Sequence, residues 1–203
     1  FKKNKLKVPK YLLLNTSNKK NLEKEISNKK IIFPIVVKPV NEGSSLGVYI
    51  CKNKKELERN YKKLIKNYDK VLVEQFIAGR EIQVAVMGNK ALGAIELVPK
   101  RKFYDYTAKY SNKAKTKHIM PAPIQLKKYN EVMGLALKAH KLLKCKGVTR
   151  SDFKYHKNKF YLLETNTQPG MTKLSLVPEI AKNANIEFEN LVDWMIKDAS
   201  YNR

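Results

Sequence analysis

The sequence predicts a mixed α/β or α+β fold with two lobes, and three observations support this prediction. Strand-like and helix-like segments alternate along the chain in two mixed groups, with a joint at about Glu74–Gly79. Apolar residues make up 43% of the 203 residues, enough to bury a substantial core. No apolar run approaches the roughly 18 residues of a membrane span, and no internal repeat is present. We therefore expect a folded protein that does not act in a membrane.

The first group contains three apolar runs that predict strands and one capped helix. A polar loop at 41–45 follows the first strand, which ends at Pro39. Asn53 followed by Glu56 is a capping-box pattern, and it predicts a helix from there to about Tyr68. The strands are expected at 35–39, 46–51 and 71–76.

The second group contains two predicted hairpins and three helices. Gly88-Asn89 predicts a turn between strands at 80–87 and 91–98, and a long basic, aromatic loop follows at 99–118. The first helix is expected at 125–144 with Gly147 as its C-cap, and its predicted buried stripe is Val132, Leu135, Ala136, Ala139 and Leu143. The remaining elements are strands at 148–155 and 160–166 and helices at 174–183 and 188–199.

Charge and cysteine content limit the classes of partner. The formal net charge is +24, but 37 of the 42 basic residues are scattered Lys and five are Arg. Because base readout favours Arg, we expect no nucleic-acid partner. Cys51 and Cys145 lie far apart without metal-ligand spacing, which favours free thiols in a reducing cytoplasm. The start lacks an apolar signal-peptide core, and the absence of an initial Met indicates part of a longer protein.

The second predicted hairpin carries a candidate metal site. If the turn comprises residues 157–159, with Asn158 left-handed, Asp152 lies opposite Glu164 and Arg150 opposite Asn166. All four side chains then share one face, and the side-chain oxygens of Asp152, Glu164 and Asn166 are the ligands that Mg²⁺ prefers. The other face, with Phe153, Tyr155, Tyr161 and Leu163, has a core pattern. A solvated face with an Arg–Asp pair remains the alternative.

Three further segments are candidates for nucleotide and substrate contacts. Glu42-Gly43-Ser44-Ser45-Leu46-Gly47 follows Lys38 and could hold phosphate oxygens with its backbone, hydroxyls and nearby ammonium group; an ordinary turn is the alternative. The apolar strand 71–77 could present its backbone to an adenine edge, with Glu81 on the ribose, or could be an ordinary strand. Pro169-Gly170-Met171-Thr172 could supply an N–H to an oxyanion, and Ser175 could hold a carboxylate.

Together these motifs resemble the ordered motif series of D-alanine–D-alanine ligases. The match comprises Lys38 with the 42–47 loop, Val73-Glu74 with Gly79-Arg80-Glu81, Phe103-Tyr104-Asp105-Tyr106 with Lys109-Tyr110, Leu163-Glu164-Thr165-Asn166-Thr167-Gln168-Pro169-Gly170-Met171-Thr172, and Ser175-Leu176-Val177-Pro178. Each motif alone is modest, but the ordered set is specific and extends to about residue 195. The resemblance implies the ATP-grasp fold, with lobes at 1–76 (the central domain) and 77–203 (the catalytic domain) sandwiching ATP.

The resemblance also implies a role for each matching residue. Toward ATP, Lys38 would contact the phosphates beneath Ser44 and Ser45, Glu74 would bind the adenine amino group, Gln75, Phe76 and Ile77 would form the hinge, and Glu81 would hold the ribose. Lys109 of a lid at 99–118 would reach the γ-phosphate, and Tyr110 would bond to Ser44. Asp152, Glu164 and Asn166 would ligate two Mg²⁺ ions, for which Mn²⁺ could substitute. Arg150 and the Gly170 N–H would stabilise the oxyanion, and Ser175 and Tyr104 would bind substrate.

The function implied by the resemblance is ATP-dependent ligation of two D-alanine molecules through an acyl phosphate, for peptidoglycan precursors in the cytoplasm. The full-length enzyme would be a homodimer, and Tyr110 after Lys109 favours dipeptide over depsipeptide as the product. We expect the family's N-terminal domain to be missing here, and the 203 residues alone to be inactive. Gln75 departs from the Lys common in the family. The alternatives are another ATP-grasp carboxylate–amine ligase and a basic nucleic-acid-binding protein.

Overall fold

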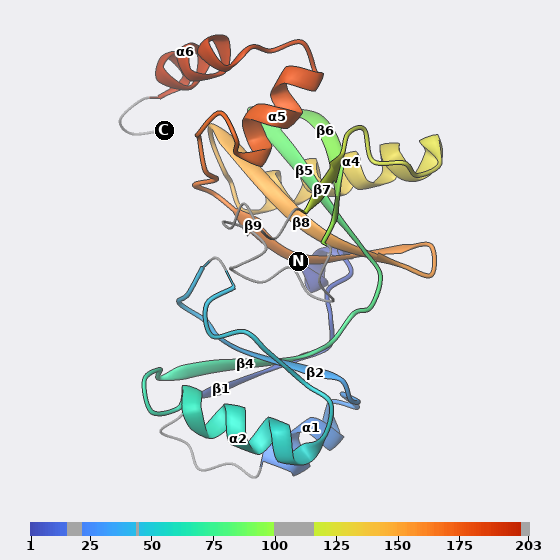
Figure 1. The fold of residues 1–203 in the computed structure, drawn as a ribbon, viewed down its shortest axis with the longest axis vertical. Helices are drawn as coiled ribbons and strands as arrows, with labels where there is room; N and C mark the ends of the chain where they lie inside the picture. The colour runs from blue at the N-terminus through green and yellow to red at the C-terminus, as the bar shows by residue number, and fades with distance from the viewer. Residues whose placement is uncertain (16–21, 44, 100–115, 200–203) are drawn as a thin grey trace. The chain divides into compact units, whose positions relative to one another are not determined.

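The computed structural model describes residues 1–15, 22–43, 45–99 and 116–199, which divide into two compact units (Figure 1). The four-stranded unit comprises the described parts of 9–77 and 99–116. The five-stranded unit comprises Phe1–Val8, Ala78–Val98 and the described part of 117–203. The units meet in sequence at Ile77 and Ala78, close to the expected joint, whereas the first eight residues pack with the later part of the chain. The assignment of functional lobes to 1–76 and 77–203 stays a prediction.

The four-stranded unit is an antiparallel sheet with helices on one face. Its described strands run in the order β1 (Tyr11–Asn15), β4 (Lys70–Gln75), β2 (Ile35–Pro39) and β3 (Tyr49–Cys51). The helices are α1 (Leu22–Asn28) and α2 (Lys54–Leu64). Alternate strand residues enter a core with both helices; it includes Leu12, Leu14, Ile26, Ile35, Val37, Leu57, Leu64, Val71 and Val73.

Local signals explain how α2 begins. The Asn53 side chain accepts a hydrogen bond from Glu56 N at 3.0 Å, as the capping pattern predicted. The Glu56 carboxylate reaches back to Lys52 N at 2.8 Å. The helix ends at Leu64, four residues before the expected end, and β3 begins at Tyr49 because Leu46 and Gly47 form a turn instead of a strand.

The five-stranded unit is also an antiparallel sheet, but helices cover both of its faces. Its described strands run in the order β7 (Lys117–Ile119), β6 (Lys90–Val98), β5 (Arg80–Met87), β8 (Val148–His156) and β9 (Lys159–Asn166). The short helix η1 (Lys2–Asn4) precedes Leu6, which joins the core on the side of α4 (Leu126–Leu142). Helices α5 (Leu176–Asn183) and α6 (Phe188–Asp198) cover part of the opposite face.

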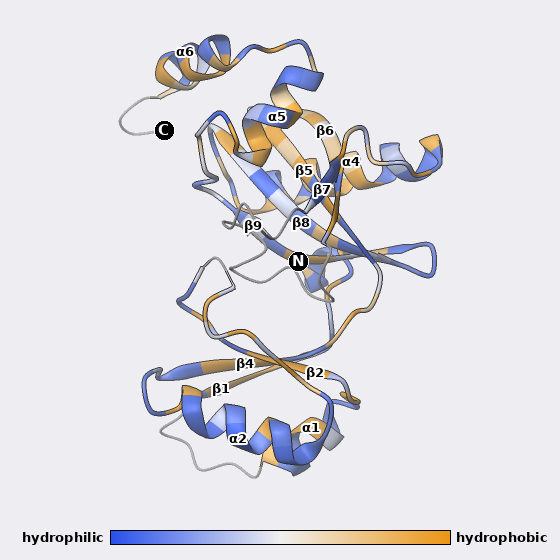
Figure 2. Cartoon of the chain, viewed as in Figure 1, coloured by the Kyte–Doolittle hydropathy of each residue, from blue (hydrophilic) through white to orange (hydrophobic). Residues whose placement is uncertain are grey.

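Strand periodicity divides the core of this sheet between the two faces. Ile82, Val84 and Val86 of β5 face α4, whereas Ala85 packs with residues of α5 and α6. Figure 2 shows β5 and β6 largely in the hydrophobic colours, consistent with burial from both sides. No helix formed by the described residues is long and apolar enough to cross a membrane.

The end of α4 differs from the prediction. Lys144, with φ of 54°, is the left-handed residue that ends the helix, because Lys144 N donates to Lys141 O and Cys145 N to His140 O. Gly147 is therefore not the C-cap; its N–H donates to Asp198 Oδ2 at 3.1 Å. Leu143 is 48% exposed rather than part of the buried stripe, which consists of Val132, Ala136, Ala139 and His140.

The β8–β9 hairpin has a shorter turn than expected and a compensating bulge. Both Lys157 and Asn158 have positive φ, and His156 pairs with Lys159, so the turn has two residues rather than three. An irregularity between Asp152 and Phe153 then shifts the register by one residue. As a result, the buried residues of β9 are Phe160 and Leu162, and the prediction of Tyr161 and Leu163 as core residues was wrong. Phe160 stacks on Tyr155 with ring centroids 4.5 Å apart.

Candidate active site

One end of the β8–β9 hairpin gathers two acidic residues, an amide and a guanidinium group. Beyond the bulge, Asp152 pairs with Glu164 and Arg150 with Asn166, as predicted. Arg150 Nε lies 2.8 Å from Asp152 Oδ1, and Arg150 Nη2 lies 2.9 Å from Asp152 Oδ2. This bidentate pair is the Arg–Asp pair considered as the alternative to a metal site. The structure brings the four residues together, and metal binding by them stays a prediction.

The side chains on this face differ in burial and pairing, but their oxygen atoms are of the kind that a hard cation prefers. The Asp152 side chain is only 7% exposed, and the paired Arg150 side chain is 14% exposed, so both charges are largely removed from water. Glu164, on the neighbouring strand β9, is exposed to solvent. Asn166 Oδ1 accepts a hydrogen bond from Gln168 N at 2.9 Å, which orients the amide. The donor set consists only of oxygen atoms, as Mg²⁺ favours. Among the described residues, no three His, Cys, Asp or Glu side chains gather into a metal-binding cluster, and this face offers two carboxylates and one amide.

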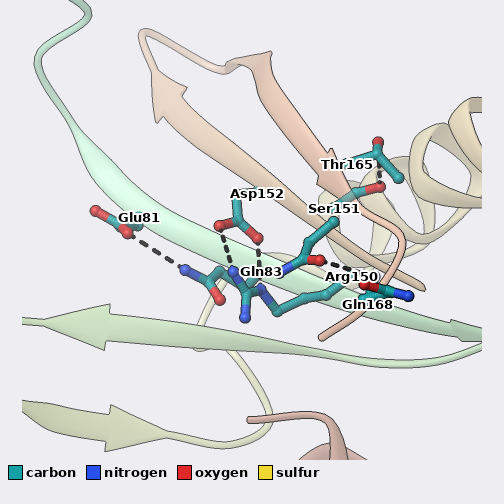
Figure 3. Close-up of polar contacts among 8 residues, drawn as sticks. Glu81, Gln83, Arg150, Ser151, Asp152, Thr165 and Gln168 are labelled. Carbon is teal, nitrogen blue, oxygen red and sulfur yellow. Dashed lines mark hydrogen bonds and ion pairs between the residues drawn. The ribbon is translucent and has the colours of Figure 1, made fainter. Parts of the chain in front are cut away.

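Strand β5 adds a polar row beside this hairpin, as Figure 3 shows. Lys154 Nζ lies 3.0 Å from Glu81 Oε2, and Gln83 Nε2 donates to Glu81 Oε1 at 3.3 Å. Gln83 is paired with Asp152 across β5 and β8 and is 1% exposed. Sequence reasoning identified Glu81 but missed Gln83. The sequence feature that could have identified Gln83 is an amide side chain two residues after Glu81, on the same face of an otherwise apolar strand.

Gly170 and Ser175 lie together after β9. A Cβ atom at Gly170 would lie 2.9 Å from Ser175 Oγ, so the glycine makes room for that hydroxyl. Ser175 precedes α5 as its N-cap residue, but its Oγ accepts from Thr172 N at 3.1 Å and lies 2.9 Å from Thr172 Oγ1. The hydroxyl is therefore fixed in the loop beside the Gly170 backbone, where the two predicted substrate contacts meet.

In the four-stranded unit, Lys38 and Glu74 form an ion pair. Lys38 Nζ lies 2.7 Å from Glu74 Oε1, and the side chains are 21% and 9% exposed. The residues occupy neighbouring strands on the sheet face away from the helices, because Glu74 is paired with Val36, two residues before Lys38. The structure thus places the predicted phosphate-binding cation beside the predicted adenine-binding carboxylate.

The Gln75 side chain forms hydrogen bonds that the sequence analysis did not predict. Its Oε1 accepts from Ile32 N at 2.9 Å, and its Nε2 donates to Ile32 O at 2.9 Å and Pro34 O at 3.3 Å. Phe76 N donates to the same Pro34 oxygen at 3.2 Å. The side chain therefore fixes the 32–34 segment against the predicted hinge at Gln75–Ile77. Nucleotide binding by the hinge backbone stays a prediction.

The predicted phosphate loop is described except for Ser44. Tyr68 Oη donates to Glu42 Oε1 at 3.0 Å, which ties the first loop residue to the chain after α2; this hydrogen bond raises the pKa of Tyr68. Ser45 and Gly47 have φ of 62° and 68°. At Gly47 a Cβ would lie 3.0 Å from the Pro39 ring, so the glycine allows the loop to pass close to the end of β2.

Four predicted site residues lie outside the described residues. Ser44 belongs to the phosphate loop, and Tyr104, Lys109 and Tyr110 belong to the predicted lid at 99–118. Their proposed roles stay predictions.

Comparison with known proteins identifies the family. The model of the family described as "D-ala D-ala ligase C-terminus" matches residues 1–197. The chain belongs to the D-alanine–D-alanine ligase family. It is 58% identical over 204 aligned residues to a D-alanine–D-alanine ligase of Pelagibacter ubique. The alignment covers 100% of this chain and 66% of the relative.

Solved structures agree with this family and with the ATP-grasp fold expected from the motifs. A D-alanine–D-alanine ligase from Bacillus anthracis is similar with a TM-score of 0.84 and 31% identity, covering 97% of this chain and 63% of that one. The same ligase complexed with ATP is similar with a TM-score of 0.81 and 27% identity, covering 97% and 62%. The chain thus spans somewhat less than two thirds of these relatives.

Proposed function

We propose that the protein carrying this chain joins two D-alanine molecules to D-alanyl-D-alanine at the expense of ATP, for peptidoglycan precursor synthesis. The family membership and the similarity to an ATP-complexed ligase support this proposal. The structural observation that carries it is the cross-strand arrangement of Arg150 and Asp152 with Asn166 and Glu164. It provides oxygen ligands and a guanidinium cation on one sheet face.

Each unit would contribute residues that contact Mg-ATP. In the four-stranded unit, Lys38 would bind phosphate oxygens, Ser44 and Ser45 would contribute loop groups, Glu74 would accept from the adenine amino group, and the Gln75–Ile77 backbone would meet the base edge. In the five-stranded unit, Glu81 would accept from ribose hydroxyls, and Asp152, Glu164 and Asn166 would hold two Mg²⁺ ions. When bound, Mg²⁺ offsets negative charge on the transferred phosphoryl group.

The reaction would proceed in two steps. A carboxylate oxygen of the first D-alanine attacks the γ-phosphorus of ATP, releasing ADP and leaving an acyl phosphate. The neutral amine of the second D-alanine then attacks the acyl carbon; phosphate leaves with the bonding electron pair, and the amine loses a proton. Arg150 and the Gly170 N–H would stabilise the oxyanion formed in this step. Ser175 and Tyr104 would hold substrate, and Lys109 and Tyr110 would close the lid.

Two finer features belong to the same proposal. The free thiols of Cys51 and Cys145 fit a reducing cytoplasm, where nucleotide-dependent precursor synthesis would take place. The full-length protein would act as a homodimer. Since the 203 residues span 66% of the Pelagibacter relative, we expect them not to release phosphate with D-alanine by themselves.

Ligand-dependent stability tests the nucleotide site on the chain itself. Mg-ATP should raise the unfolding temperature, because a ligand that binds only the folded state adds about 2.7 kcal/mol at roughly 100 times its Kd. Glu164→Gln should reduce this increase while leaving the unliganded unfolding temperature near that of the wild type. The matched control is Glu131→Gln, an exposed position on α4, across the sheet from the site. No increase with wild type at millimolar Mg-ATP would refute the nucleotide site.

Substrate choice needs a separate measurement on the protein at the length of its relatives. A panel of D- and L-amino acids as acceptors, with product identified by mass spectrometry, separates D-alanyl-D-alanine formation from the activity of another ATP-grasp carboxylate–amine ligase. A main product other than D-alanyl-D-alanine would replace the proposed substrates while leaving the nucleotide site intact.

A further inference from the structure

Gln83 has the one buried side-chain nitrogen or oxygen atom without a hydrogen-bond partner in the described part of the chain. Its Oε1 atom has no partner, and the residue is 1% exposed. Native proteins pair nearly all buried polar atoms, so a buried acceptor left alone indicates either a strained feature or a group that awaits a donor. Its location in the candidate active site favours the second explanation.

The hydrogen bond to Glu81 sets the orientation of the Gln83 amide. Nε2 donates to Glu81 Oε1 at 3.3 Å, and the reversed amide would place two oxygen atoms against each other. Gln83 also pairs directly with Asp152 across the strands, and Ala85 pairs with Arg150, which places Gln83 diagonally opposite the arginine. Figure 3 shows the Gln83 side chain between Glu81 and the Arg150–Asp152 pair.

The Arg150–Asp152 pair limits how Asp152 can bind a cation. Both carboxylate oxygens already accept from the guanidinium group at 2.8 and 2.9 Å. A divalent ion bound to the same carboxylate would repel this guanidinium, so metal binding favours partial release of Arg150. Released donors on a largely buried side chain need a new acceptor.

We infer that Gln83 is a positioning residue whose Oε1 accepts a hydrogen bond from Arg150 when Mg²⁺ and nucleotide occupy the site at Asp152. This inference rests on the proposed function and assigns it a residue outside the predicted ligand set. Gln83 then links Glu81, the proposed ribose ligand, to Arg150, the proposed oxyanion-stabilising group. In the unliganded protein the same oxygen is a source of instability, since its desolvation has no compensating bond.

The inference predicts that an apolar replacement of Gln83 weakens Mg²⁺-dependent nucleotide binding and has little effect on stability. Gln83→Met keeps a long unbranched side chain and removes the buried acceptor. Without ligand, the unfolding temperature should change by no more than about 2–4 °C, because removal of the unpaired acceptor offsets the loss of the Nε2–Glu81 hydrogen bond. The Kd for a non-hydrolysable ATP analogue at saturating Mg²⁺ should increase about 5- to 10-fold, and half-saturation should need more Mg²⁺. Without Mg²⁺, the Kd for the analogue should match that of the wild type.

Isothermal titration of the 203-residue chain with the analogue, at a series of Mg²⁺ concentrations, measures these effects. Thr149→Val is the control: Thr149 is fully buried on the opposite face of β8 and bonds His140 Nδ1 at 2.8 Å, so its loss should lower stability without changing the Mg²⁺ dependence. Wild-type chain that fails to bind the analogue refutes the proposed function. Wild-type binding with an unchanged Mg²⁺ dependence in Gln83→Met refutes the role of Gln83 alone.

Discussion

Replacing Gly79 with Ala tests the backbone at the start of β5, the strand that carries Glu81 and Gln83. Gly79 has φ of 131°, a conformation that L side chains rarely adopt. A Cβ atom there would lie 2.3 Å from the carbonyl oxygen of Tyr155, about 1 Å closer than ordinary van der Waals contact. That oxygen belongs to the backbone of β8, whose Tyr155 pairs with Arg80, so it cannot move without disturbing the sheet.

The structure allows an estimate of the loss. An unfavourable backbone region costs about 1–3 kcal/mol, and the angular distortion needed to relieve the contact adds about 2–4 kcal/mol. Together these contributions should reduce the free energy of unfolding of the five-stranded unit in Gly79→Ala by about 3–7 kcal/mol. The control is Gly134→Ala in α4, where nothing lies within 4 Å of the new Cβ; this variant should gain about 0.5–1 kcal/mol through helix propensity.

Urea unfolding followed by tryptophan fluorescence measures both variants, because the single Trp of the chain, Trp194, lies in α6 of the five-stranded unit. A loss below about 1 kcal/mol in Gly79→Ala, with the Gly134→Ala gain as expected, would show that β8 yields easily and would refute the reasoning.

Three further predictions follow from single contacts. Gln75→Lys should weaken binding of a non-hydrolysable ATP analogue in titrations, because Lys lacks an acceptor for Ile32 N; equal or tighter binding would favour a direct contact with the base. Gly170→Ala should raise the KM for the second D-alanine in the protein at the length of its relatives, because the new Cβ displaces Ser175 Oγ; an unchanged KM would remove that hydroxyl from substrate binding. Burial lowers the pKa of the His140 imidazole from its ordinary value of 6.5. Below pH 6.5 the unfolded chain takes up a proton at this residue that the folded chain resists, so the free energy of unfolding decreases as the pH falls. Above pH 6.5 the imidazole is neutral in both states, and this dependence vanishes. Urea unfolding between pH 5 and 8 should show a shallower decline in His140→Gln than in the wild type, and equal slopes would contradict the assignment.

Local patterns predicted the elements whose causes lie within a few residues. Strand β5 begins at Arg80 and ends at Met87 as expected, because its alternation and the Gly88 turn are both local. The capping contact of Asn53 formed as expected for the same reason. Strand β1 was not predicted, although Leu12 and Leu14 alternate in it; it exists as an edge strand because it pairs with β4, about 60 residues later in the chain.

Sequence pattern placed the predicted metal-site residues correctly, but the turn assumed for them was wrong. The three-residue turn at 157–159 would pair Asp152 with Glu164 without a bulge, whereas the observed two-residue turn needs the bulge to reach the same pairing. The bulge arises because Phe160 and Leu162 must face the core while Glu164 must not, and this competition between distant contacts is invisible in local spacing.

The sequence by itself determined the family and the alternation of strands and helices. It also determined which acidic and amide residues, Asp152, Glu164 and Asn166, form the predicted metal-ligand set. All of these depend on residue identity and order. Only the tertiary structure decided which groups satisfy one another. It paired Arg150 with Asp152 and Lys38 with Glu74, directed the Gln75 amide to Ile32, and left Gln83 Oε1 without a partner. These outcomes depend on which strands become neighbours, since hydrogen bonds and ion pairs act over a few ångströms between residues far apart in the chain.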